Sequence, residues 1–283
     1  DGQVKRMIAR ANPDVNKFWM CDEGRLNTKF VRAENRLTSP RGTARELAAA
    51  AQAVVAKHGE GSVGGIVSAW ITVEEMFLSR QLMAALKAPY PGLLTLTRGE
   101  RQTFPGGFTI ENDRTPNRAG GAIFFGRESS EAGLEGVIAG ISSGKLKGLI
   151  VLNGIPDFAF PPALVAAASK LEFLAVIDIQ SSPLSEAAHV VLPGAAWAEK
   201  DGTFVNIDRR AQRIRRAVAP PGSASSEIEP LQNALVDLGV RQRVVSAEGV
   251  FREVVKEVKD FAGLDYGRIG LQGAPLAPAG AAP

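Results

Sequence analysis

The second half of the chain alternates between two hydrophobic patterns. Short apolar runs at residues 149–152, 173–179 and 189–192 indicate buried strands, whereas apolar residues at helical spacing occupy 130–142 and 162–170. Strands that alternate with helices of about ten residues predict a parallel sheet that helices cover on both faces. We therefore expect an α/β fold with three layers and a mainly parallel sheet.

The first half continues this alternation with clearer helix signals. An alanine-rich run at 46–57 predicts one helix, and Thr72-Val-Glu-Glu75 predicts a capping box that opens a second. We expect Glu74 and Glu75 to face the helix dipole in that first turn rather than to act as a catalytic pair. Other predicted elements are strands at 63–68, 93–97 and 122–125, helices at 227–238 and 248–261, a long polar loop at 98–121 and a disordered tail at 273–283.

Three loops follow the predicted strands of the second half, at residues 126–129, 153–157 and 178–183. Ligands of open parallel sheets bind beyond the carboxyl ends of the strands, at the edge where such loops gather. These loops are therefore the first place to expect a ligand.

Composition excludes several classes of protein and of site. The 283 residues carry a formal net charge of +3, which is too small to indicate a nucleic-acid partner. No apolar run reaches the roughly 20 residues of a membrane helix, and the first residues contain no export signal. With one cysteine (Cys21) and two histidines (His58 and His189), cysteine and histidine of this chain alone cannot complete a zinc or iron–sulfur site.

An arginine-dense segment stands out between residues 188 and 222. Two β-type runs, 189–192 and 203–205, flank a polar turn, and five arginines follow between Arg209 and Arg216. These arginines are typical of a solvated face with ion pairs to neighbours. Contact with an anionic cofactor or a partner subunit is an alternative, and nucleic acid is disfavoured because no aromatic residues are interleaved to stack bases.

The same segment resembles a known family. The runs VVLP (190–193), AEKDGTFVN (198–206) and RRAQRIRRAVAPPG (209–222) resemble the closing motif of the molybdopterin oxidoreductase superfamily's large chain. That superfamily includes formate dehydrogenases and the large iron–sulfur subunit of NADH:quinone oxidoreductase (complex I), which lacks the molybdenum site. The resemblance implies a fold like those of formate dehydrogenase and DMSO reductase.

The resemblance also assigns roles to individual residues. Cys21, followed by Gly24 and Arg25, matches the position of the fourth thiolate ligand of a [4Fe–4S] cluster whose other ligands would lie upstream, so that the cluster itself is not expected within these residues. The remaining signature positions are expected to fix loop geometry rather than to react: Arg25, Glu199, Lys200, Asn206 and Arg209. The implied division is a remnant of an iron–sulfur domain at 1–40, the α/β domain at 41–240 and a C-terminal helix with a disordered tail at 241–283.

Between the two branches, we expect the complex I branch. No cysteine follows Cys21, and about 60 residues after Gly222 leave no room for the β-barrel that closes over the second pterin. Molybdopterin is therefore not expected, and the pterin site is interpreted as vestigial. The implied function is a structural scaffold within the large electron-transfer subunit, without a catalytic site of its own. It would contact other subunits of the peripheral arm, which would hold it at the cytoplasmic face of the membrane without insertion.

Two alternatives stay open. One is a molybdopterin-dependent oxidoreductase of the formate dehydrogenase alpha type, with the cofactor held partly by another chain. The other is a non-redox α/β module that binds an anion or a partner at the crevice.

Overall fold

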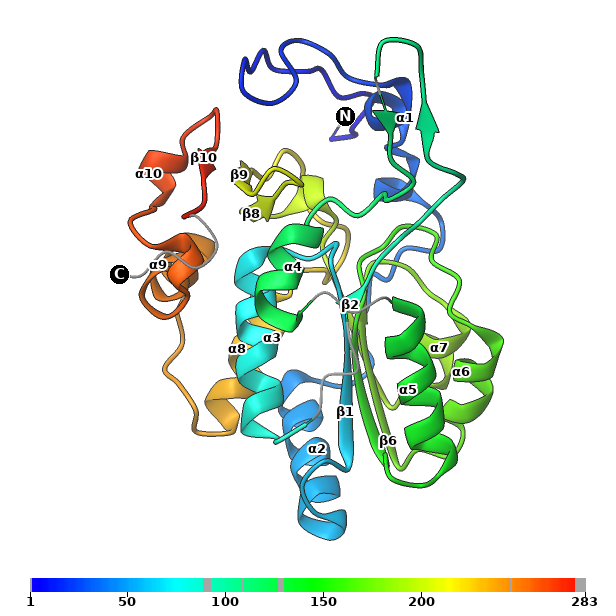
Figure 1. Ribbon diagram of the computed structural model, residues 1–283. Helices are drawn as coiled ribbons and strands as arrows, with labels where there is room; N and C mark the ends of the chain where they lie inside the picture. Colours follow the sequence, from blue (N-terminus) through cyan, green and yellow to red (C-terminus); the bar gives the residue numbers. More distant parts are fainter. Residues whose placement is uncertain (1, 89–92, 108, 127–129, 245, 278–283) are drawn as a thin grey trace.

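A five-stranded parallel sheet organises the molecule (Figure 1). The computed structural model describes residues 2–88, 93–107, 109–126, 130–244 and 246–277. The spatial order of the strands is β2-β1-β5-β6-β7, and every neighbouring pair is parallel. Their bounds are β1 (Val63–Ser68), β2 (Leu93–Leu94), β5 (Gly148–Leu152), β6 (Phe173–Asp178) and β7 (Val190–Pro193).

Helices cover both faces of this sheet (Figure 1). One face carries α2 (Ala44–His58), α3 (Val73–Ala85) and α8 (Ile228–Asp237), and the other carries α5 (Ser130–Ser142), α6 (Pro162–Ala168) and α7 (Pro183–Ala187). Successive residues of a strand point to opposite faces, so Ile150 packs in the core cluster on the α2–α3 side and Val151 packs in the cluster on the α5–α6 side. The three-layer α/β prediction is confirmed.

A small antiparallel sheet lies near the N-terminal end of α3, where Gly202 of its first strand meets Thr72. It has the order β10-β9-β8, with β8 (Gly202–Val205), β9 (Arg210–Ile214) and β10 (Ala274–Pro275). Strand β9 thus forms the middle of the run of arginines from Arg209 to Arg216. The prediction of disorder from residue 273 is wrong at its start, because β10 pairs with β9 and Leu276 is buried; residues 278–283 lie outside the described residues.

The predicted strand at 122–125 is instead part of helix α4 (Arg118–Phe125), which Gly126 ends with a φ of +83°. A short apolar run fits a buried strand or a helix segment equally well by periodicity. Packing decides here, because Phe124 is buried in the core cluster on the α3 side and stacks on Phe261. The loop before α4 contains a short hairpin, β3 (Gln102–Thr103) and β4 (Thr109–Ile110).

The two ends of the chain differ in how much core they share. The first 40 residues hold α1 (Asp22–Leu26) and the 3₁₀ helix η1 (Lys29–Arg32), from which Phe30 and Val31 pack against the carboxyl end of β6. Helix α9 (Ala247–Glu257), the 3₁₀ helix η3 (Lys259–Phe261) and α10 (Tyr266–Ile269) join the core cluster on the α3 side. The divisions at 40 and 240 remain predictions. No helix in the described part of the chain is long and apolar enough to cross a membrane.

Candidate functional site at the carboxyl edge of the sheet

The order of the strands predicts where a ligand would bind. The chain runs from β1 to β2 on one side and then crosses to β5 on the other side of β1, so the direction of winding switches between β1 and β5. Ligands of open α/β sheets bind outside the carboxyl ends of the strands at such a switch point.

A cavity of about 270 Å³ lies at this point, and we call it the carboxyl-edge cavity. Segments that follow β1, β2 and β5 form one wall, and the N-terminal segment forms the other. Its lining consists of Met7, Cys21, Gly24, Asn27, Phe30, Trp70, Leu96, Arg98, Arg114, Pro156, Asp157 and Trp197. The N-terminal segment thus closes over the edge where the sheet presents its loops.

The lining of the carboxyl-edge cavity is more cationic than anionic. The guanidinium groups of Arg98 and Arg114 line it, and Asp157 is the single carboxylate. The indole Nε1 of Trp70 is buried without a hydrogen-bond partner among the described residues. Two arginines against one carboxylate favour an anionic ligand.

Asp178, at the end of β6, ties two of the carboxyl-edge loops together. Its buried carboxylate accepts hydrogen bonds from Asn153 Nδ2 at 2.9 Å, from the Gly154 amide at 3.2 Å and from the Ile179 amide at 2.7 Å. Burial raises the pKa of Asp178 to about 6, although these three hydrogen bonds oppose the shift. Gly154 has a φ of +98°, a conformation that favours glycine.

A second contact joins the same loops. Gln180 donates from Nε2 to Asp157 Oδ1 at 3.0 Å, and its Oε1 accepts from the Asp157 amide at 2.7 Å. The structure therefore brings the predicted loops 153–157 and 178–183 together at the carboxyl edge. It does not place the third predicted loop there: residues 127–129 lie outside the described residues, and Gly126 lines a different cavity.

Cys21 lies exposed on the N-terminal side of the carboxyl-edge cavity. Its Sγ accepts a hydrogen bond from the Gly24 amide at 3.3 Å, and Arg25 Nη2 donates to the Met20 carbonyl at 3.3 Å. Within the described ranges, no three His, Cys, Asp or Glu side chains are placed to hold a metal ion. The role of Cys21 as a cluster ligand stays a prediction.

The other signature residues each tie a loop to a neighbouring element. Asn206 Oδ1 accepts from the amides of Asp208 at 3.1 Å and Arg210 at 2.8 Å within the β8–β9 turn. Arg209 pairs with Asp260 at 2.6 Å. Glu199 and Lys200, at the end of the 3₁₀ helix η2 (Trp197–Glu199), enter two separate buried ion clusters.

Sequence reasoning missed the partners of those two residues. Glu199 accepts from Arg36 Nη2 at 2.7 Å, and Lys200 donates to Glu75 and Glu227. The expected capping box of Thr72 and Glu75 is present, and Glu75 is fully buried. The signal in the sequence was that Glu75 lies among apolar residues, which indicates a buried carboxylate that needs an ionic partner.

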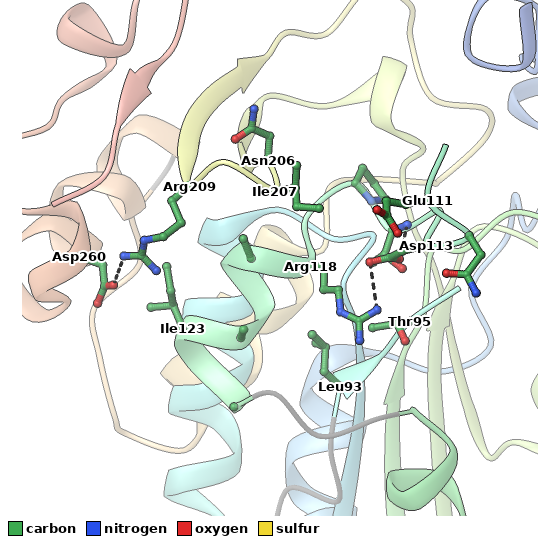
Figure 2. A pocket seen from close by; sticks show the side chains of 16 residues that line it. Leu93, Thr95, Glu111, Asp113, Arg118, Ile123, Asn206, Ile207, Arg209 and Asp260 are labelled. Carbon is green, nitrogen blue, oxygen red and sulfur yellow. Dashed lines mark hydrogen bonds and ion pairs between the residues drawn. The ribbon is translucent and has the colours of Figure 1, made fainter. Parts of the chain in front are cut away.

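A larger cavity of about 1000 Å³ lies over α4, as Figure 2 shows. The Arg209–Asp260 pair lies on one side of α4, close to Ile123, and the Arg118–Asp113 pair lies on the other side. Both arginines already have a carboxylate partner. The charges on both sides of this cavity are therefore already paired.

Comparison with known proteins finds a family model that matches part of the chain. Residues 115–233 match the family described as "Molybdopterin oxidoreductase". The chain is 39% identical over 109 residues to "F420-dependent formate dehydrogenase 2 subunit alpha" of Methanococcus maripaludis, covering 38% of this chain and 16% of that protein. It is 30% identical over 183 residues to "Assimilatory nitrate reductase catalytic subunit" of Bacillus subtilis, covering 60% and 25%.

Among solved structures, acetylene hydratase from Pelobacter acetylenicus aligns with a TM-score of 0.39 and 14% identity, over 51% of this chain and 21% of that chain. The chain spans 16% to 25% of the length of the two curated relatives above.

These findings correct two expectations from the sequence. The relatives are named as formate dehydrogenase and nitrate reductase chains, which favours the oxidoreductase alternative over the complex I subunit. The expectation that molybdopterin is absent is not supported, because the matching family is named for that group. The similarity to the molybdopterin oxidoreductase family model extends over residues 115–233.

Proposed function

We infer that this chain is part of the alpha-type large subunit of a molybdopterin-dependent oxidoreductase similar to formate dehydrogenase. In this proposal the carboxyl-edge cavity forms one wall of the cofactor site. The observation that carries the proposal is the position of a cationic cavity at the switch point of the sheet, bordered by residues of the family-matched stretch.

The residues of the carboxyl-edge cavity fit one end of a pterin dinucleotide. The two arginine side chains suit a phosphate. The volume of about 270 Å³ lies just below the roughly 300–1,000 Å³ of small-molecule sites, so this wall holds a part of the group rather than the whole.

Each residue of this wall would have a specific task. Arg98 and Arg114 would neutralise a phosphate, and Asp178 would hold the loop at Gly154 in shape through its hydrogen bonds. Asp157, fixed by Gln180, would accept a hydrogen bond from the ligand's ring. When bound, the molybdenum–pterin group supplies the redox chemistry, while these residues bind and orient it.

The complex I subunit is the competing hypothesis; the block from Cys21 to Arg25 resembles a cluster-ligand block of both branches and does not separate them. Under that hypothesis the fold is the same, but the carboxyl-edge cavity binds no guanine nucleotide. Binding of a guanine nucleotide therefore separates the two proposals.

The test is calorimetric titration of this chain with guanosine diphosphate as a probe of the dinucleotide's end. We expect saturable binding that Arg98→Ala weakens about tenfold, the equivalent of one charge-assisted hydrogen bond. The matched control is Arg101→Ala, since the exposed Arg101 pairs with Glu111 at 3.0 Å and does not line the carboxyl-edge cavity. Absence of binding, or equal weakening by both variants, would contradict the proposal.

A further inference from the structure

A buried cluster of three charged residues lies away from the carboxyl-edge cavity. Lys200 Nζ donates to Glu75 Oε2 at 2.9 Å and to Glu227 Oε2 at 2.6 Å. The three side chains are at most 2% exposed. We call Glu75, Lys200 and Glu227 the acid–lysine cluster. It contains two carboxyl groups and a single ammonium group.

Glu75 has the better hydrogen bonding of the two acids. Besides Lys200, its oxygens accept from the Thr72 amide at 2.8 Å, from Ser226 Oγ at 2.7 Å and from the Glu227 amide at 3.1 Å. Burial alone would raise the pKa of Glu75, but the charge of Lys200 and hydrogen bonds from the Thr72 amide and from Lys200 lower it to about 2. Glu75 is therefore the ionised partner of Lys200.

Glu227 stands at the start of α8 with much poorer support. Its Oε2 accepts from Lys200, and its Oε1 is buried with no partner among the described residues. A buried carboxylate with an unsatisfied oxygen is strongly disfavoured. Burial, and then the nearby charge of Glu75, raise the pKa of Glu227 well above its ordinary value.

The surrounding charged groups do not supply a second cation to Glu227. Glu74 of α3 accepts from Thr203 and from the Tyr266 hydroxyl. Glu199, next to Lys200, is occupied by arginines from the N-terminal segment, and Asp178 by its own loop. Within the described residues, Lys200 is the one cationic group within 4 Å of the Glu227 carboxyl.

We propose that the acid–lysine cluster is a proton-dependent latch. With a proton on Glu227, it joins the N-terminal ends of α3 and α8 to the segment between η2 and β8; loss of that proton opens this joint. Trp197, at the start of η2, lines the carboxyl-edge cavity three residues before Lys200. Opening of the latch would therefore shift Trp197 in the wall of the carboxyl-edge cavity.

The sign of the pH dependence follows from the raised pKa of Glu227. A proton is held more tightly in the folded state than in the unfolded state, where a glutamate has a pKa of about 4.3. The stabilisation is complete below that value and is lost as the pH rises through the folded pKa. The latch is closed in acid and opens in alkali.

The test is thermal unfolding of the wild type and Glu227→Gln between about pH 5 and about pH 9. Glutamine resembles the protonated acid, so we expect the variant to melt at or above the wild type, by a margin that grows with pH. The contrasting variant is Glu75→Gln, which removes the ionised partner of Lys200; we expect its melting temperature to fall by on the order of 10 °C. A margin for Glu227→Gln that does not change with pH would overturn the proposal.

A second measurement needs no destabilised variant. The infrared carbonyl band of a protonated carboxylic acid should be present in the folded wild type near neutral pH. We expect Glu227→Gln to remove part of this band and Glu74→Gln to remove a separate part, because the pKa of Glu74 is raised to about 7, chiefly by burial. An unchanged band in Glu227→Gln would show that Glu227 is ionised and overturn the latch.

Discussion

Two buried ion clusters meet at consecutive residues and have opposite charge ratios. Glu199 lies between two arginines, with Arg32 Nη1 at 2.7 Å and Arg36 Nη2 at 2.7 Å. Its neighbour Lys200 lies between two carboxyl groups. One cluster has an excess of cations and the other an excess of acids.

The excess of each charge has a different consequence. Arginine keeps its charge at every accessible pH. The extra positive charge of the first cluster is solvated, because the Arg32 side chain is one-third exposed. Both oxygens of Glu199 are also saturated, since the Ala196 amide donates to Oε2 at 2.9 Å. A glutamic acid can instead take up a proton. The acid–lysine cluster therefore responds to pH, and the arginine cluster does not.

The largest effect should come from removing the shared cation. Lys200→Met leaves two buried carboxyl groups without a positive partner, and we expect a loss of about 3–5 kcal/mol in the free energy of unfolding. Denaturant unfolding at neutral pH measures it. The control is Lys57→Met, whose lysine forms an exposed pair with Glu172; we expect about 0.5 kcal/mol or less. Equal losses would show that burial does not decide the strength of these pairs.

Loss of the shared anion in the other cluster should cost somewhat less. Glu199→Gln leaves Arg36 buried without its carboxylate, but Arg32 can turn into water, so we expect about 3 kcal/mol. Because no guanidinium titrates, this loss should stay constant between about pH 6 and about pH 9. Unfolding curves over that range test it, and a loss that changes steeply with pH would erase the contrast between the clusters.

A third buried acid, Glu74, sharpens the comparison because its hydrogen-bond partners among the described residues are neutral. Glu74 accepts from the Thr203 amide at 2.9 Å, from Thr203 Oγ1 at 2.8 Å and from the Tyr266 hydroxyl at 2.7 Å. Burial raises its pKa to about 7, so its stabilisation is complete below about pH 4 and is lost as the pH rises through 7.

The change attributable to Glu74 over that range is on the order of 3 kcal/mol in the free energy of unfolding. Glu74→Gln should flatten this part of the curve of stability against pH, whatever the variant's absolute stability. The same slope in wild type and variant would show that Glu74 titrates normally.

The sequence predicted what depends on local pattern. The strand at 63–68 has the predicted bounds because all six of its residues are buried between two layers. The capping box of Thr72 and Glu75 was readable because its two residues are three apart. The run at 122–125 misled because a short apolar segment has no period long enough to separate strand from helix.

Contacts between residues far apart in the sequence could not be predicted from it. Lys200 meets Glu75 across 125 positions and Glu227 across 27, and no local pattern links them. The carboxyl-edge cavity likewise draws its lining from several separate segments. Two loops of this edge could be predicted, because parallel strands end at the same side of a sheet. The closing wall around Cys21 could not.

The most direct test of the proposed function is an analysis of molybdenum and guanine nucleotide in the natural full-length protein, purified without oxygen. We predict that both are present, in a fixed ratio to each other. We also predict that Arg98→Ala lowers the content of both, whereas Arg101→Ala lowers neither. Iron with neither molybdenum nor guanine nucleotide would contradict the proposal and favour the electron-transfer subunit instead.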